Sequence, residues 1–455
     1  MNTKASTRRD FLRSSTLAAG IAAFPTIVPS SVFGKNAPSN RVTLAAFGTG
    51  GRGSSNCWSN FVPHKDVQFL AAADPFGHRR ERFAARVNKR KGDNACKPYE
   101  DFREVLARKD IDGVVISTPD HWHVPLAYHA AMAGKDMYVE KPLGVAMAWA
   151  MKLREAVEKN KVVFQYGTQQ RSASYSRMGM DLLRNGYVGE IKRVEVWSPA
   201  LGESDGRFHV KPYGSTEPAP VPKDLNYDMW IGPAPMKPYT IDRTVNACAF
   251  HNYDYALGYI AGWGAHPLDI AQWGLDSDHT SPVRYEGTGK FPPAGALCNT
   301  ITSWDVQCKY ANGVAMRFMS RDVAMPVVKK YHSVFRHDGT TFFGTDGWVS
   351  VSRGGCYMVR NGKKANTQLF KFKDSDQHVY HSNSQARNFI DCIKSRKPTI
   401  NPLESAIRAD TISHMSDICI RMKRPIQWDP KKEQIVGDEE ASKMLDRPMR
   451  SPWVM

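Results

Sequence analysis

Short apolar runs alternate with amphipathic stretches through the first third of the chain. The runs expected to be strands are residues 42–47, 67–72, 113–117, 137–140 and 162–166. The stretches expected to be helices are residues 79–89, 124–133 and 145–160. Such alternation is typical of βαβ units, whose strands form a parallel sheet. We therefore predict an α/β chain whose residues 41–168 form a doubly wound nucleotide-binding domain.

Beyond residue 168, apolar and polar positions alternate in several short segments. The clearest are 191–198, 301–308 and 313–319, and further short strands are expected to about residue 360. This period predicts a large, open, mostly antiparallel sheet with one solvated face. The proline-rich segment 212–240 should be an ordered loop, whereas 382–395 and 403–423 have helical periodicity. We assign 169–427 to a C-terminal α+β domain and 428–455 to an extended segment that wraps over the first domain.

The first 34 residues are interpreted as an export leader that is separate from the fold. An arginine pair, Arg8 and Arg9, precedes an apolar stretch at 17–28, which is the pattern of a twin-arginine signal. That stretch is short and contains Pro25, so no stable membrane anchor is expected. We predict cleavage near Gly34 and delivery by the twin-arginine machinery to the periplasm or beyond. The alternative is a basic N-terminus with no export role.

Composition and charge restrict the class of partner. The 455 residues suit about two domains, and 42% of them are hydrophobic, which is enough for large cores. The net charge of +17 is spread along the chain, with no basic run interleaved with aromatic residues, so nucleic-acid binding is not predicted. An acidic or sulfated carbohydrate remains open as a substrate. The eight cysteines form no CxxC pair, and no metal site is predicted.

A glycine-rich loop directly follows the strand predicted at 42–47. Its first glycine permits a tight turn, the second lets a pyrophosphate approach the backbone, and the third lets the next helix pack closely. Asp74 ends the second predicted strand, where a carboxylate can accept both adenosine ribose hydroxyls and so favours NAD. Arg79 and Arg80 follow closely and leave NADP open. The cofactor-binding residues expected here are Gly48, Gly50, Gly51, Arg52, Gly53 and Asp74.

A second group of polar residues follows the strands predicted at 113–117 and 137–140, at the edge where open α/β folds bind ligands. Beside a positively charged nicotinamide, the amine of Lys141 would have a lowered pKa. It could then accept a hydroxyl proton while hydride leaves the same carbon. The alternative is a surface lysine beside a turn proline. The cofactor-binding residues expected at this edge are Thr118, Pro119, Trp122, His123, Glu140 and Lys141.

These motifs resemble those of the glucose-fructose oxidoreductase / inositol dehydrogenase / rhizopine catabolism (Gfo/Idh/MocA) family, over nearly all of residues 41–455. The matching segments are 48–53, 72–74, 117–119 with His123, 140–142 and 266–269, and 224–233 and 428–430 resemble its secreted bacterial branch. The resemblance implies a Rossmann domain and a sugar or polyol substrate. It also implies a homo-oligomer, a dimer or tetramer, formed through the open face of the second sheet.

The same resemblance implies that Lys141 and His266 are the catalytic residues. A neutral histidine would polarise the substrate oxygen or relay a proton to it, and Asp269 would fix its orientation or cap nearby amides. Many relatives carry an aspartate four residues before this histidine, but here that position is Gly262. Either another group performs its role or the chemistry differs. The candidates for that role are Asp254, Tyr255, Tyr259 and Asp269.

Three more residues are expected near the substrate on the basis of the resemblance. Tyr166 and Arg171, beyond the last strand of the first domain, should line the substrate side, and Gln169 should lie near the nicotinamide. Tyr255 and Asp269 complete the expected substrate contacts.

Two enzymatic readings follow from these residues. The first is an exported oxidoreductase that oxidises a sugar hydroxyl and returns the hydride to a second carbonyl compound. The second is a glycosidase that uses bound NAD for transient oxidation at C3, elimination of the aglycone and addition of water. Free dinucleotides are scarce outside the cytoplasm, so in both readings the cofactor is tightly held and regenerated. A catalytically inactive sugar-binding protein is the third, non-enzymatic reading.

Overall fold

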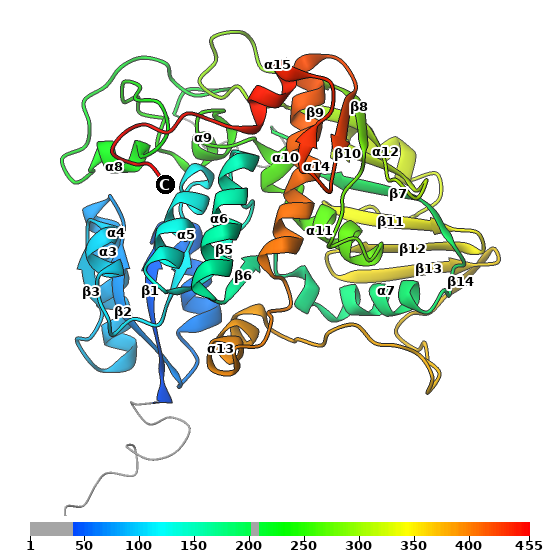
Figure 1. Ribbon diagram of the computed structural model, residues 1–455, viewed down its shortest axis with the longest axis horizontal. Helices are drawn as coiled ribbons and strands as arrows, with labels where there is room; N and C mark the ends of the chain where they lie inside the picture. Colours follow the sequence, from blue (N-terminus) through cyan, green and yellow to red (C-terminus); the bar gives the residue numbers. More distant parts are fainter. Residues whose placement is uncertain (1–39, 202–208) are drawn as a thin grey trace, which may run out of the picture. The chain divides into compact units, whose positions relative to one another are not determined.

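Two β-sheets organise the part of the chain that the computed structural model describes, residues 40–201 and 209–455 (Figure 1). The leader predicted at 1–34 lies outside these residues. From Val42 to Met455 the chain forms one compact unit, in which the first sheet and its helices lie beside the second, larger sheet. Within the described residues, no helix combines the length and apolar character needed to cross a membrane.

The first sheet has six parallel strands in the order β3-β2-β1-β4-β5-β6. The strands are β1 (Val42–Phe47), β2 (Val67–Ala73), β3 (Lys97–Tyr99), β4 (Gly113–Ile116), β5 (Asp136–Glu140) and β6 (Phe164–Gly167). The helical segments between them are α2 (Gly51–Asn56), η3 (Cys57–Phe61), α3 (Gly77–Lys91), α4 (Phe102–Leu106), α5 (His123–Met132) and α6 (Met147–Asn160). The predicted doubly wound fold is confirmed. The strand order reverses between β1 and β4, and ligands of such folds bind in the crevice at that point.

The inner strands of this sheet are mainly apolar because both faces of the sheet are covered. Along β1, Ala45 and Phe47 belong to the core that includes α5 and α6, whereas Leu44 and Ala46 belong to a second core built with η3 and α3. Side chains of a strand alternate between the two faces, so a sheet buried on both sides needs continuous apolar runs. β3 was not predicted because its three residues are largely exposed and carry no such run.

The second sheet has ten strands in the order β14-β13-β12-β11-β7-β10-β9-β8-β15-β16. Their bounds are β7 (Ile191–Ser198), β8 (Arg284–Lys290), β9 (Ser303–Lys309), β10 (Ala315–Ser320), β11 (Gly339–Gly344), β12 (Gly347–Ser352), β13 (Gly355–Arg360), β14 (Lys363–Ala365), β15 (Ile426–Asp429) and β16 (Gln434–Ile435). All neighbours pair antiparallel except β7 and β10, which are parallel. The predicted mostly antiparallel sheet is therefore confirmed.

Helices cover one face of this sheet and connect it to the first. α7 (Ser174–Arg184) packs on β12 and β13, α11 (Ala265–Gly274) on β7 and β11, and α14 (Leu403–Met422) on β8. α14 also contacts α6 and β6 of the first domain, which is why it is buried along nearly its whole length. The other helices are α8 (Tyr227–Ile231), α9 (Asn246–His251), α10 (Tyr259–Gly262), α12 (Arg321–Val328), α13 (Gln385–Ser395) and α15 (Glu439–Ser442).

The C-terminal segment contains more regular structure than an extended wrap. β15 and β16 extend the second sheet at its edge, and α15 follows them. The last residues then reach the first domain near α8 (Figure 1). There the ring of Trp453 lies edge-on to Trp122, with 5.5 Å between the ring centroids, and 6.5 Å from Phe102.

Candidate active site

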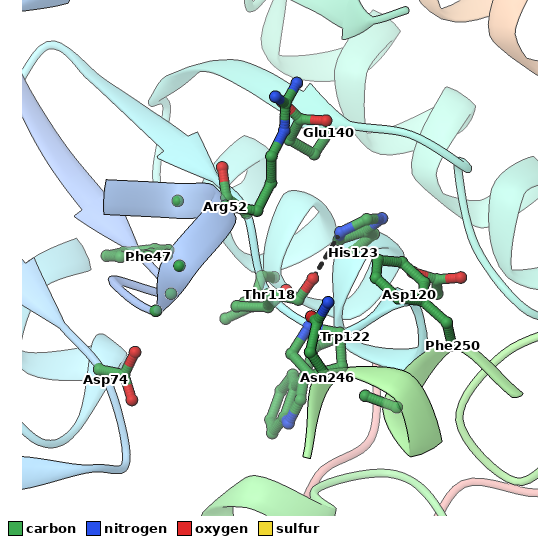
Figure 2. A pocket seen from close by; sticks show the side chains of 18 of the residues that line it. Phe47, Arg52, Asp74, Thr118, Asp120, Trp122, His123, Glu140, Asn246 and Phe250 are labelled. Carbon is green, nitrogen blue, oxygen red and sulfur yellow. Dashed lines mark hydrogen bonds and ion pairs between the residues drawn. The ribbon is translucent and has the colours of Figure 1, made fainter. Parts of the chain in front are cut away.

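A cavity of about 550 Å³ lies at the carboxyl ends of the first sheet's strands, a usual size for a small-molecule site. One wall comes from the loops after β1, β2, β4 and β5. The other wall comes from α9 to α11 and from the turn between β12 and β13. Figure 2 shows Asn246 and Phe250, from α9, facing the residues at 118–123. The two halves of the chain therefore build the cavity together.

The glycine loop is packed so tightly against β4 that two of its positions admit no side chain. Gly48 has φ +79, and a Cβ there would lie 2.7 Å from the carbonyl oxygen of Ser117. A Cβ on Gly53 would lie only 1.9 Å from the oxygen of Gly48. A Cβ on Gly51 would meet nothing within 4 Å. The backbone at Gly51 is therefore open to the cavity, as the close approach of a dinucleotide pyrophosphate requires.

Asp74 and Arg52 occupy the expected ends of this cradle (Figure 2). The carboxylate of Asp74 accepts hydrogen bonds from the backbone N–H of Thr49 at 2.7 Å and of Phe76 at 2.9 Å. Burial raises the pKa of Asp74. Oδ2 also accepts a longer hydrogen bond from Thr49 Oγ1 at 3.3 Å, whereas Oδ1 keeps a lone pair for a ribose hydroxyl. Arg52 donates to Oε1 of Glu140 through Nη2 at 2.8 Å and Nε at 3.1 Å, which pairs the two charges.

Lys141 follows β5 and points across the cavity to the second domain. Its Nζ donates a hydrogen bond to the carbonyl oxygen of Gly262 at 2.6 Å and lies 5.6 Å from the ring centre of Phe250. Burial lowers the pKa of Lys141, while the charges of Glu140 and Asp120 act in the opposite direction. A lowered pKa lets a lysine act as a base near neutral pH.

His266, on α11, lies in the same cavity and is neutral. Burial lowers its pKa well below the usual value, and the charges of Arg353 and Lys141 add to the effect. Its Nδ1 lies 2.8 Å from the carbonyl oxygen of Thr168. That contact assigns the proton to Nδ1, because a carbonyl can only accept. Nε2 is thus left with a lone pair that can accept a hydrogen bond or a proton.

Two residues expected at the substrate lie elsewhere. Arg171 and Asp269 form a buried ion pair, with 2.7 Å between Nη2 of Arg171 and Oδ1 of Asp269. Asp269 also accepts a hydrogen bond from Thr168 Oγ1 at 2.8 Å. It therefore does not contact His266 directly. It fixes Thr168, whose carbonyl oxygen orients the imidazole.

The two tyrosines are likewise outside the lining of the cavity. The hydroxyl of Tyr166 donates to Asp410 at 2.8 Å, and that of Tyr255 accepts a hydrogen bond from Arg243 at 3.1 Å. Both side chains are fully buried. Sequence order alone put them beside the cavity, but each hydroxyl has an internal partner, which burial of a polar group requires.

The remaining predicted cofactor residues do line the cavity: Thr118, Pro119, Trp122, His123 and Gln169. His123 lies between two loops, with Nδ1 2.6 Å from the Pro142 oxygen and Nε2 2.9 Å from the Thr118 oxygen. Figure 2 draws the second of these contacts. Burial lowers the pKa of His123 to about 4. Gln169 adopts the left-handed conformation at φ +66, and its backbone N–H donates to Gln385.

Several lining residues were missed by sequence reasoning: Asp120, Asn246, Phe250, Trp263 and Arg353. Asp120 stands inside the motif at 118–123 and could have been found there. The others come from segments far along the chain with no motif of their own. Arg353 reaches the cavity from the β12–β13 turn, where its guanidinium lies 5.1 Å from the Trp263 ring centre.

Known families and proteins match this chain in both of its halves. A family model described as oxidoreductase family, NAD-binding Rossmann fold, matches residues 42–168. A second, described as oxidoreductase family, C-terminal alpha/beta domain, matches residues 183–324 and 355–455. The cavity residues before 168 lie in the first match, and Arg353 lies in the gap of the second.

Among curated proteins, the chain is 30% identical over 172 residues to the alpha-N-acetylgalactosaminidase of Shewanella oneidensis. The match covers 36% of this chain and 37% of that protein, and the glycosyl hydrolase family 109 protein of a second Shewanella strain is matched over the same share of its length. The chain thus spans little more than a third of these relatives.

Among solved structures, GenD2 from gentamicin A biosynthesis, in complex with NAD, is 17% identical with a TM-score of 0.58, covering 86% of this chain and 97% of GenD2. A myo-inositol dehydrogenase from Corynebacterium glutamicum is 16% identical with a TM-score of 0.54, covering 86% and 99%. At these identities the likeness establishes the fold.

Proposed function

Because the chain belongs to the Gfo/Idh/MocA oxidoreductase family, with an NAD-binding Rossmann domain, we propose that it oxidises a hydroxyl group of a sugar or polyol. The proposed enzyme acts in the periplasm or outside the cell, keeps its NAD bound, and returns the hydride to a second carbonyl substrate. NAD is favoured over NADP because the carboxylate of Asp74 directly follows β2 and lines the cavity, and Arg79 in the same lining keeps NADP as the alternative.

The position of Lys141 is the observation that carries this proposal. Its amine lies in the cavity between the glycine cradle and the wall formed by Phe250 and His266. A bound NAD would supply the hydride acceptor. Lys141 would take the hydroxyl proton, and Nε2 of His266 would accept a hydrogen bond from the same or a neighbouring hydroxyl. Phe250 and Trp263 give the sugar ring an apolar surface.

The proposed export route and the retention of the cofactor are connected. The arginine pair at the N-terminus supports a route that carries folded proteins. An enzyme exported in that way could load NAD before leaving the cytoplasm. Denaturing the mature protein purified from the periplasm and identifying the released dinucleotide tests this step. A mature protein without dinucleotide would contradict it.

Lys141→Met tests the role of the amine. General-base catalysis contributes about 10²–10⁴-fold to a rate, so we expect turnover to fall by that amount while bound NAD is retained. Lys159→Met, at an exposed position of α6, is the matched control. Turnover of the true substrate by Lys141→Met at the wild-type rate would refute the proposed function.

A glycosidase that uses bound NAD catalytically is the second candidate. It is supported by two observations: Gly262 carries no carboxylate beside Lys141, and matched relatives are named as glycosidases. The native protein can be screened against free sugars and aryl glycosides at the absorbance band of reduced nicotinamide. Lasting reduction by a free sugar, reversed by a carbonyl compound, supports the oxidoreductase. Release of aglycone without net reduction supports the glycosidase.

We also propose that the protein forms a homo-oligomer, a dimer or tetramer, in which the subunits contact one another through the open face of the second sheet. Light scattering of the purified protein measures its mass directly. A particle with the mass of a single chain, 51.0 kDa for all 455 residues and less after cleavage of a leader, would exclude an oligomer in solution.

A further inference from the structure

Asp120 is a buried carboxylate that lines the cavity. It begins the short turn η4 (Asp120–Trp122) that follows β4, and only 1% of its surface is exposed. In the part of the chain that the structure describes, neither oxygen has a hydrogen-bond partner outside its own residue. Burial of an unpaired charge is costly, and orphaned buried polar atoms are rare in native proteins. Asp120 therefore needs either a proton or a charged neighbour.

Lys141 lines the same cavity as Asp120 and is the cation whose charge acts on it. The charge of Lys141 lowers the pKa of Asp120 against the raising effect of burial, and the charge of Asp120 raises that of Lys141. Glu140 also acts on Lys141, but its Oε1 is already paired with Arg52. Asp120 is thus the carboxylate near the amine that has no cation of its own. Asp120 and Lys141 also have charge interactions with other ionisable groups. These groups are Arg52, His123, Glu140, Tyr166, His266, Arg353 and Asp410.

The amine needs such a counter-charge. Desolvation and the cations Arg52 and Arg353 all favour the free amine of Lys141. A free amine can accept a proton, but a cycle that returns the hydride must also return the proton. The ammonium form must therefore persist between the two steps. In a partly dry site a nearby anion stabilises this form, in addition to the hydrogen bond that Nζ donates to the Gly262 carbonyl.

We propose that Asp120 is a positioning residue for the proton of Lys141, holding the ammonium form in place during the reaction. This inference rests on the proposed function. In the forward step the substrate O–H bond breaks, its proton forms an N–H bond on Nζ, and the C–H electron pair leaves as hydride for NAD. In the return step the hydride reduces a carbonyl carbon, and Nζ gives the proton to its oxygen. The nicotinamide loses a positive charge as the amine gains one, so the charge of the site is constant.

Asp120→Asn is the first test, because the amide keeps the shape and removes the charge. Removing an opposite charge at close range shifts a pKa by about 1–3 units, so the pKa of Lys141 should fall by that amount. Competitive labelling of lysine with an acylating reagent across pH, read by mass spectrometry, measures this without turnover. In the carbonyl-reducing direction, the alkaline limb of the pH–rate profile should move to lower pH by the same amount. Asp305→Asn, whose partner is Arg317 on the second sheet, is the control.

Restoring a carboxylate from the other wall is the second test. A Cβ on Gly262 would meet only ring carbons of Tyr259 at 3.7 Å and Phe250 at 3.8 Å, which is ordinary contact. The carbonyl oxygen of Gly262 is 2.6 Å from Nζ. Gly262→Asp combined with Asp120→Asn should therefore return the pKa of Lys141 and the alkaline limb toward their wild-type positions. A purely structural role of Asp120 predicts no such rescue.

An unchanged Lys141 labelling profile in Asp120→Asn would overturn the inference. If bound NAD were lost while that profile stayed unchanged, Asp120 would instead be a cofactor ligand. If Asp120→Asn fails to fold, Lys141→Met gives the reciprocal measurement. Asp120 is then buried without a cation, so the stability of this variant should fall more steeply with rising pH than that of the wild type. An unchanged pH dependence of its melting temperature would also overturn the pairing. These readings stand even if Lys141→Met retains turnover, which would refute only the proposed function.

Discussion

At the scale of single residues, some glycines of the loop after β1 are needed for packing and others for cofactor binding. A glycine is required at position 53 because any Cβ there would clash with the backbone of Gly48, whereas a Cβ on Gly51 would point into open space. The same residue type thus serves two purposes within three positions. The sequence motif alone does not distinguish them.

Substitution by alanine at these two positions tests the distinction. Gly53→Ala places a Cβ 1.9 Å from a backbone oxygen. We therefore expect the free energy of unfolding to fall by at least about 1–3 kcal/mol, the usual cost of overpacking. Gly51→Ala should leave unfolding unchanged and weaken NAD binding, because the methyl group occupies the space of the pyrophosphate. Denaturant unfolding and titration with NAD measure the two effects. Equal loss of stability in both variants would contradict this reading.

At the scale of elements, α14 holds the turn that carries Lys141. Asp410 on this helix accepts hydrogen bonds from the backbone N–H of Leu143 at 2.7 Å and from the hydroxyl of Tyr166 at 2.8 Å. It thereby ties β6 and the turn after β5 to one helix. Burial raises the pKa of Asp410 to about 7.

This carboxyl should make stability depend on pH. An aspartate in an unfolded chain titrates near pH ~3.9, so between about pH 4 and pH 7 the folded chain holds the proton more tightly than the unfolded chain. The free energy of unfolding must then fall as pH rises through this window. Asp410→Asn keeps an acceptor oxygen for Leu143 and places an amide N–H toward Tyr166, whose hydroxyl can accept it, but the amide cannot ionise.

We expect Asp410→Asn to reduce the loss of stability between pH 5 and pH 8. The upper bound is about 3 kcal/mol, from roughly 1.4 kcal/mol per unit over roughly two units between pH 5 and the pKa of Asp410 at about 7. Denaturant unfolding at the two pH values measures it, with Asp305→Asn as the control for a surface carboxylate. An identical slope in wild type and Asp410→Asn would show that Asp410 is ionised in the folded chain throughout this window.

At the scale of the whole molecule, the chain end closes the outer side of the cavity. Trp453 packs against Phe102 and Trp122, and both of those residues line the cavity on their other side. Arg450 pairs with Asp228 at 2.6 Å beside α8. The last residues of the chain thus support a wall that begins more than three hundred residues earlier.

Trp453→Ala should therefore affect both stability and cofactor retention. Truncation of a buried tryptophan costs about 3–5 kcal/mol, and the space left behind Trp122 should loosen the cavity wall and speed release of NAD. Trp58→Ala, at a partly exposed site on η3, is the control. Melting temperature and the dissociation rate of NAD are the measurements. Wild-type retention of NAD in Trp453→Ala would separate the chain end from the cofactor site.

The sequence by itself determined the sheet architecture and the cofactor loop. Apolar runs over β1, β2, β4 and β5 were readable because burial on both faces makes most positions of such a strand apolar. The glycine loop and Asp74 were readable because their roles depend on backbone geometry close in sequence. β3 escaped because its exposed residues carry no such pattern.

The tertiary structure alone decided which side chains meet in the cavity. Tyr166, Arg171, Tyr255 and Asp269 are polar and near the site in sequence, yet each has an internal partner that sequence order cannot reveal. Arg353 and Asn246 line the cavity because the packing of the second sheet and α9 brings them there. Asp120 was visible in the sequence, but its lack of a hydrogen-bond partner was not. The apolar–polar repeat of a helix or strand depends on residues close in sequence. The hydrogen-bond and ion-pair partners of a side chain can lie hundreds of residues away, and they depend on how the two sheets pack.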